Sequence, residues 1–142
     1  MSDILINEVD ITLDFDNLDS DLLDIKNHYS KNDGGCFWIV EHKNDSHIIG
    51  TVAIRNLKDL VSISSAELKR MFLAKSYRGL GIGQQMIETA IDFAKRMGYT
   101  RILLDSSKKL KVSRNLYLKN GFLDISRYNN NHRADVFMEK KL

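Results

Sequence analysis

Three glycines at alternate positions give one segment of this chain the clearest potential for chemistry, Arg78-Gly79-Leu80-Gly81-Ile82-Gly83. Glycines leave the backbone N–H groups uncovered. A helix that starts directly after them adds its own unpaired N–H groups and the positive end of its dipole. Together these groups form a site for an anionic diphosphate. We therefore expect a ligand that carries a pyrophosphate.

Two other phosphate-binding motifs compete for this segment. A P-loop needs a lysine followed by serine or threonine at a fixed offset from its first glycine, and counting from Gly79 those positions hold Gln85 and Met86. A dinucleotide fingerprint has two residues between its second and third glycines, but only Ile82 stands there. About twenty residues further on, where an acid should meet the ribose, the sequence has Arg101. Binding of a nicotinamide dinucleotide is therefore the weakest of the interpretations that we keep.

The glycine segment lies between a strand and a helix. Residues 66–73 have the composition of a central strand, and Gly98 is typical of the position that ends a helix. The short apolar run 102–104 that follows predicts a strand buried on both faces. A strand–helix–strand unit implies a parallel pair of strands. Between the glycines and Gly98, helical periodicity is shown by Met86, Ile87, Ala90, Ile91, Ala94 and Met97.

The remaining patterns predict a mixed sheet with helices on both faces. We expect an α/β (α+β) fold, a three-layer α/β/α sandwich whose central sheet is mixed and mostly antiparallel, with one central parallel pair. The length suits one domain over residues 1–142. Alternation, turn signals and helical spacing predict further strands at 4–15, 37–40, 48–54, 122–128 and 134–140, and helices at 18–29 and 110–119.

Composition narrows the function classes. The net charge is only +2, from 21 basic and 19 acidic residues, so we expect no nucleic-acid partner. The single cysteine, Cys36, suits a reducing cytoplasm, and the histidines show no metal spacing with it, so we expect no metal. No apolar run approaches the roughly 18 residues of a membrane span, and the N-terminus has no signal-peptide pattern. The sequence does not decide whether the chain forms a homodimer.

Four segments resemble the GNAT family of N-acetyltransferases. The segment from Arg78 to Gly83 matches the family's acetyl-coenzyme A loop, which reads Gln or Arg, two residues, Gly, one residue, Gly or Ala. Residues 67–73 resemble its fourth strand, and 84–97 its third helix. The run from Tyr117 to Phe122 resembles the signature that closes its last helix. The resemblance implies a GNAT-like fold and an acetyl-CoA-dependent transfer of an acetyl group to a primary amine of a small molecule or peptide.

The resemblance also implies roles for individual residues. Arg78 and the backbone of Gly79, Leu80, Gly81, Ile82 and Gly83 would hold the pyrophosphate, with Gln84 as an added donor. Met71 and Phe72 would line the tunnel for the pantetheine arm, and the N–H of Leu73 would stabilise the oxyanion. Tyr117 would protonate the departing thiolate. Glu67, eleven residues before Arg78, would be the general base, the alternative being a structural acid paired with Lys69 or Arg101.

One departure from the family pattern keeps a second function open. Leu110 stands where many members have an asparagine that binds the pantetheine arm, and Ser113 replaces an alanine. The alternative is therefore a non-catalytic module that binds or senses acyl-CoA. Lysines at the start of the same helix suggest an anionic neighbour, such as the 3′-phosphate of coenzyme A, or a solvated basic loop. The acceptor would lie among residues 18–35, 56–62 and 129–132.

Overall fold

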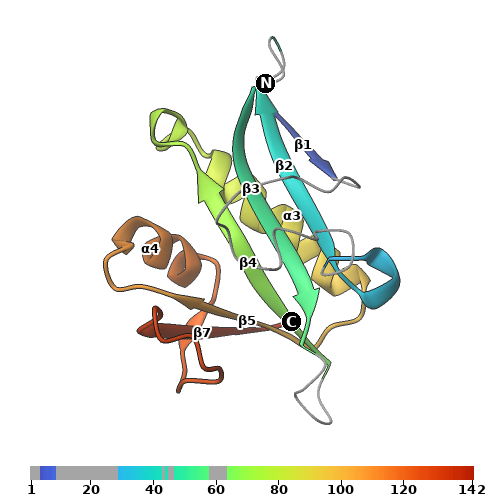
Figure 1. Cartoon of the computed structure of the whole chain (residues 1–142), viewed down its shortest axis with the longest axis vertical. Coiled ribbons are helices and arrows are strands. Elements are labelled where there is room, and N and C mark those ends of the chain that lie inside the picture. The colour runs from blue at the N-terminus through green and yellow to red at the C-terminus, as the bar shows by residue number, and fades with distance from the viewer. Residues whose placement is uncertain (1–3, 9–28, 43, 45–46, 58–63) are drawn as a thin grey trace.

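The computed structural model describes residues 4–8, 29–42, 44, 47–57 and 64–142 (Figure 1). They form one seven-stranded sheet in the order β1-β2-β3-β4-β5-β7-β6. The strands are β1 (Ile4–Glu8), β2 (Cys36–His42), β3 (Ile48–Asn56), β4 (Ser65–Leu73), β5 (Arg101–Ser106), β6 (Leu123–Asp124) and β7 (Val136–Lys141). The helices are α3 (Ile82–Arg96), α4 (Lys111–Lys119) and the short 3-10 turns η1 (Lys31–Asp33) and η2 (Lys75–Tyr77).

The pairing of the strands confirms the predicted mixed sheet. Strands β2 and β3 form the expected antiparallel hairpin. Strands β4 and β5 are the parallel pair, and every other pair of neighbours in the described sheet is antiparallel. Most of the predicted helix at 18–29 lies outside the described residues, as do residues 9–15 of the first predicted strand and residues 58–63 of the loop after β3.

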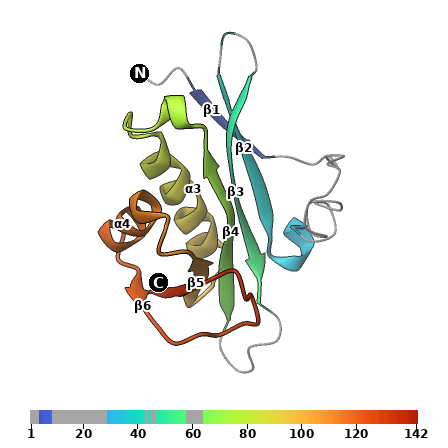
Figure 2. The same ribbon diagram turned by 60° about the vertical axis from the view of Figure 1, so that its left-hand side comes forward.

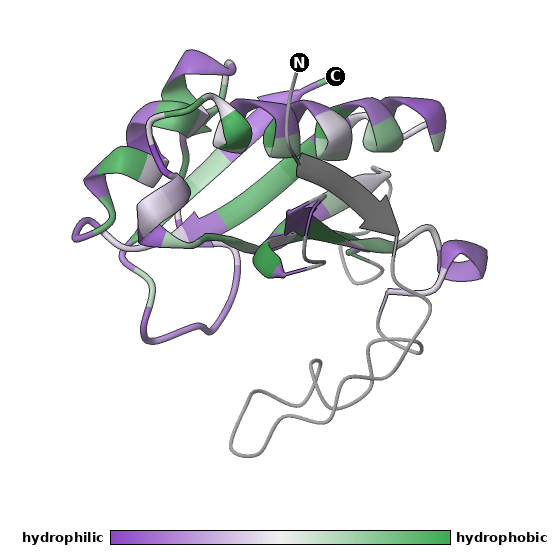
Figure 3. Ribbon diagram, turned by 90° about the horizontal axis from the view of Figure 1, so that it is seen from above, coloured by the Kyte–Doolittle hydropathy of each residue, from purple (hydrophilic) through white to green (hydrophobic). Residues whose placement is uncertain are grey.

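Helices α3 and α4 cover the same face of the sheet (Figure 2). The apolar stripe of α3 supplies much of the core, and hydrophobic parts of helices and strands face each other while hydrophilic parts lie outside (Figure 3). The helix ends at Arg96 with Met97 as its C-cap, and Gly98 follows with a φ of +84°, the left-handed conformation expected after a helix C-terminus. Residues 102–104 of β5 are buried, as predicted. The buried residues of α3 are Ile82, Met86, Ile87, Ala90, Ile91, Phe93 and Ala94.

The predicted strand at 122–128 is wrong over most of its length. Only Leu123 and Asp124 pair with β7, and one further N–H, that of Ile125, donates to Phe137 O at 2.9 Å. The chain then leaves the sheet edge, because the hydroxyl of Tyr128 reaches across to Glu67 on β4. Phe122 is fully buried with its ring centroid 5.9 Å from that of Tyr117, so its apolar character reflects the core rather than a strand.

Strands β4 and β5 part after only three pairs of residues. Ser65–Glu67 pair with Arg101–Leu103, after which β4 runs on to Leu73 and β5 to Ser106 without pairing to each other. A bulge accompanies the divergence, since the register between β3 and β4 shifts between Thr51 and Ala53. Arg70 lies in this bulge with a φ of +55°, and its carbonyl accepts a hydrogen bond from Thr51 Oγ1 at 2.7 Å. The result is a cleft between two neighbouring strands.

Candidate functional site

A cavity of about 490 Å³ lies where the end of β4, the glycine loop and helix α4 meet; we call it the loop cavity. Its described lining contains four basic side chains and no acidic one, so its electrostatic character suits an anion. The structure thus brings the glycine loop and β4 together with α4. The lining residues are Met71, Phe72, Leu73, Arg78, Gly79, Gly81, Gly83, Gln84, Lys109, Leu110, Lys111, Val112, Ser113, Leu116 and Lys119.

The glycine loop has the geometry of an anion site. Gly79 and Gly81 have φ of +80° and +81°, which only glycine adopts at little cost, and a Cβ at either position would meet nothing within 4 Å. Gly81 is the N-cap of α3, and no side chain caps the first turn of the helix. Leu80 is 68% exposed, whereas Ile82 is buried in the core and can therefore serve a ligand only through its backbone.

Arg78 and Gln84 have partners that define what each can offer a ligand. Arg78 Nε donates to Leu73 O at 2.9 Å, which fixes the side chain against the end of β4 and leaves its Nη groups for a phosphate. Gln84 Nε2 donates to Glu88 Oε1 and to Asn120 Oδ1, both at 2.8 Å. Its side chain therefore joins α3 to the end of α4, and its donor role toward a ligand stays a prediction.

The free edge of β4 faces the cleft at Leu73. The N–H of Ala74 donates to Ile49 O on β3 at 2.7 Å, so the alternation of the strand directs the N–H of Leu73 to the opposite edge. The carbonyl of Leu73 accepts from Arg78 on that same edge. Phe72 is largely exposed and Met71 half-buried, and both line the loop cavity beside Leu73. An extended ligand can therefore lie along this edge as an added strand.

A second cavity, of about 360 Å³, lies in the cleft itself; we call it the cleft cavity. It shares Met71, Leu110 and Ser113 with the loop cavity, so the two cavities are adjacent. Tyr117 lies in its wall, only 6% exposed, and its hydroxyl has no hydrogen bond to a described residue. Burial, and to a lesser extent the charge of Asp105, raises the pKa of Tyr117 to about 12. The hydroxyl is therefore protonated at neutral pH and available as a donor.

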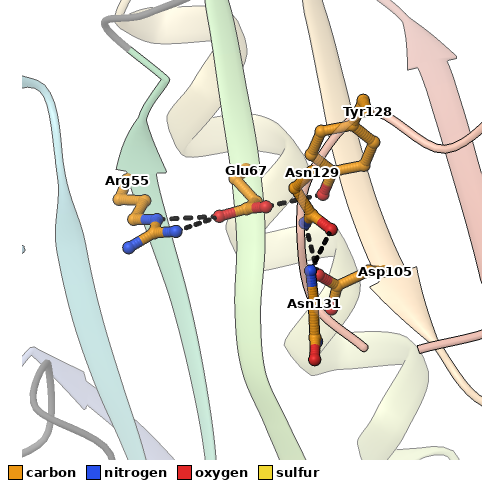
Figure 4. A network of polar contacts seen from close by, with 6 residues as sticks. All are labelled: Arg55, Glu67, Asp105, Tyr128, Asn129 and Asn131. Carbon is orange, nitrogen blue, oxygen red and sulfur yellow. Dashed lines mark hydrogen bonds and ion pairs between the residues drawn. The ribbon is translucent and has the colours of Figure 1, made fainter. Parts of the chain in front are cut away.

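Glu67 is buried and bound on both carboxylate oxygens (Figure 4). Its Oε1 accepts from Nε of Arg55 at 2.7 Å and forms an ion pair with Nη2 at 2.7 Å. Its Oε2 accepts from the Tyr128 hydroxyl at 2.6 Å. The sequence suggested Lys69 or Arg101 as the partner of Glu67, but the structure pairs Glu67 with neither. Arg101 contacts Ser65 and Glu139 instead. The general-base role of Glu67 stays a prediction.

Sequence reasoning missed the polar residues around Glu67 and the cleft. Asp105 follows the apolar run of β5 and lines the cleft cavity, and Asn129 Nδ2 donates to its Oδ2 at 2.6 Å. Burial and the Glu67 carboxylate raise the pKa of Tyr128 well above its usual range. The sequence did contain one signal for Asp105. It directly follows the apolar run 102–104, and an acidic residue next to a buried run is a candidate for a functional site.

These features define a fold with a cleft between two parallel strands and an anion-binding loop at its end. The Acetyltransferase (GNAT) family matches residues 5–122, and the chain belongs to this family. It is 33% identical over 105 residues to the probable N-acetyltransferase camello of Xenopus tropicalis, an alignment that covers 74% of this chain and 46% of the relative. The chain thus spans about half the length of the curated relatives it matches.

Solved structures of acetyltransferases have the same fold as this chain. An acetyltransferase of the GNAT family from Staphylococcus aureus Mu50 is 26% identical, with a TM-score of 0.82 over 97% of this chain and 98% of that one. The PaiA N-acetyltransferase of Thermoplasma acidophilum, solved in complex with coenzyme A, is 25% identical, with a TM-score of 0.61 over 76% of this chain and 61% of that one. Among the described residues of our chain, no helix has the length and apolar character of a membrane span.

Proposed function

We propose that this chain transfers the acetyl group of acetyl-CoA to a primary amine of a small molecule or peptide, by direct attack in a ternary complex. Membership of the GNAT family and the coenzyme A complex of the PaiA relative support the cofactor. The feature of the chain that supports it best is that the two cavities lie side by side, with Met71, Leu110 and Ser113 lining both. A single extended molecule can therefore reach from the glycine loop to Tyr117.

The described residues fit coenzyme A in charge and shape. The open space beside Gly79 and Gly81 and the uncapped start of α3 suit a diphosphate, and Arg78 adds a fixed cation. Lys109 and Lys111 line the same cavity, where they can neutralise a further phosphate. The edge of β4 offers backbone groups to an amide-bearing arm. Leu110 replaces a polar family residue with an apolar wall, and this shifts the recognition of the arm onto β4.

The chemistry needs one donor for the carbonyl oxygen and one for the departing sulfur. The nitrogen lone pair of the amine attacks the thioester carbon, and the N–H of Leu73 stabilises the negative charge that develops on the oxygen. As the C–S bond breaks, the Tyr117 hydroxyl gives its proton to the thiolate. The tyrosinate formed there regains a proton from solvent, and the amine releases one. The bound acetyl-CoA supplies the activated acyl carbon.

The acceptor reaches the cleft from the face of the sheet opposite α3. Residues from the loop between β6 and β7, including Asn131 and Arg133, line the cleft cavity on that side. Loops vary in sequence more freely than the scaffold does, so this wall is expected to set which amine is used.

A thiol-release assay with a panel of amines tests the proposal. We expect release of coenzyme A that depends on the amine, together with a 1:1 heat of coenzyme A binding in calorimetry. Binding without turnover on any amine would favour the second candidate, the acyl-CoA-binding module, which the apolar Leu110 motivates. Stabilisation by NAD but not by coenzyme A would contradict both.

A further inference from the structure

Two carboxylates lie on the same face of the sheet, beside the point where β4 and β5 part. Glu67 is the register partner of Leu103 on β5, and register partners share a face. Asp105 is two residues beyond Leu103, so it lies on that face as well. The intervening Leu104 belongs to the core under α3. Both carboxylates therefore face the side from which we expect the acceptor amine.

The two carboxylates differ in their access to the cleft. Glu67 is 1% exposed, three N–H or O–H groups from Arg55 and Tyr128 surround it, and it lines neither the loop cavity nor the cleft cavity. Both of its carboxylate oxygens are therefore occupied by groups of the protein. Asp105 is half-buried and lines the cleft cavity, and its charge acts on the hydroxyl of Tyr117 in the same wall. Only Asp105 can meet a substrate there.

The contacts of Glu67 and Asp105 meet in consecutive residues of one loop (Figure 4). Tyr128 binds Glu67, and Asn129 binds Asp105 through Nδ2. Asn129 Oδ1 also accepts from the N–H of Asn131 at 3.1 Å, and Asn131 lines the cleft cavity. The Tyr128 ring packs edge-on against Phe137, with centroids 5.7 Å apart. Glu67 therefore fixes the position of the residues that orient Asp105 and wall the cleft.

We propose that Asp105 binds the ammonium group of the acceptor amine, and that Glu67 is a positioning residue that holds the β6–β7 loop in place. The inference rests on the proposed acetyl transfer and assigns its acceptor site. An amine that is protonated in solution needs an opposite charge in a half-buried cavity. Asp105 is the one carboxylate in the described lining, which also contains the basic residues Lys69, Arg70 and Arg133, so the ammonium group has to bind at Asp105 itself. The ammonium then gives one proton to water in the open cleft, its N–H bond breaks, and the neutral nitrogen attacks.

The variant Asp105→Asn tests the ammonium site with the best amine of the panel. We expect its KM for that amine to rise at least about tenfold, while its affinity for coenzyme A stays within about twofold of wild type. The alcohol analogue of the amine, in which a hydroxyl replaces the ammonium, serves as a competitive inhibitor, and its Ki should not change. Asp92→Asn, an exposed carboxylate on α3 outside both cavities, is the matched control. An unchanged KM, or an equal loss for amine and alcohol, would overturn the assignment.

The variants Glu67→Gln and Tyr128→Phe separate a positioning role from a base. If Glu67 holds the loop through Tyr128, both variants raise the KM for the amine by a similar factor. The double variant then adds little, and kcat stays within about fivefold of wild type. Loss of a general base would instead lower kcat at least about 100-fold in Glu67→Gln alone. That result, with Tyr128→Phe near wild type, would refute the positioning role.

A folding defect is recognised by thermal melting and by coenzyme A affinity, and Tyr128→Phe tests the loop contact even if Glu67→Gln does not fold. A failure of the proposed function looks different from a failure of this inference. It appears in the wild-type protein, as coenzyme A binding without turnover of any amine.

Discussion

Replacing Gly79 with alanine separates the cost of backbone conformation from the cost of blocking the diphosphate site. Gly79 has a φ of +80° and Gly98 one of +84°, and a Cβ at either position meets nothing within 4 Å. The two substitutions therefore impose the same strain without a steric clash. A left-handed conformation costs a non-glycine residue about 1 kcal/mol, so we expect each variant to lose about 1 kcal/mol in the free energy of unfolding. This corresponds to a Tm lower by about 3–5 °C.

The two variants should differ in coenzyme A binding, because only Gly79 lines the loop cavity. A methyl group there stands between the ligand and the backbone N–H groups. Loss of one hydrogen bond to a charged oxygen costs about 1.5–3 kcal/mol, or about 10- to 100-fold in Kd. Isothermal titration calorimetry with coenzyme A measures this, and differential scanning calorimetry measures the unfolding. Equal Kd values for Gly79→Ala and wild type, or an equal weakening by Gly98→Ala, would refute the argument for the glycine loop.

Three further predictions test the donors and the strand edge. Tyr117→Phe should lower kcat by about 100-fold and leave the Kd for coenzyme A unchanged. Because the pKa of Tyr117 is raised to about 12, the wild-type rate, measured as a function of pH, should not fall through ionisation of this tyrosine between pH 7 and 10. Arg78→Gln should weaken coenzyme A binding about tenfold and flatten its salt dependence, measured by titration at several ionic strengths. Gly50→Ala should lower both Tm and coenzyme A affinity, because its Cβ would lie 2.7 Å from Phe72 O on β4; a normal Tm would show that the bulge of β4 adapts.

Local patterns predicted the elements that carry the diphosphate site. The glycine run, the apolar stripe of α3 and the terminal Gly98 are short-range signals, and each fixes backbone conformation within a few residues. The buried run of β5 similarly predicted a central strand, and with α3 between them the parallel pairing to β4 followed. Family resemblance assigned Tyr117 the role of general acid, and in the structure this residue lines the cleft cavity.

The partners of the buried and polar groups could not be read from the sequence. Glu67 contacts residues 12 and 61 positions away, and no periodicity links positions that only the folded sheet brings together. The same contact explains why the predicted strand at 122–128 was wrong. The segment ends in Tyr128, whose hydroxyl is satisfied by a carboxylate on β4 rather than exposed on a strand. The bulge at Arg70 also has no sequence signal, because the residue with positive φ is not glycine.

The short pairing of β4 with β5 is the geometric source of the whole site. If the pairing continued to the end of β5, its last residue, Ser106, would pair near Arg70, and no cavity would separate Met71 from Ser106. Because β5 also pairs with β7 over all six of its residues, its direction is fixed by that antiparallel partner. Strand β4 is fixed in turn by β3 and bends at its bulge. The cleft is thus held open by the two outer partners of the diverging strands, β3 and β7.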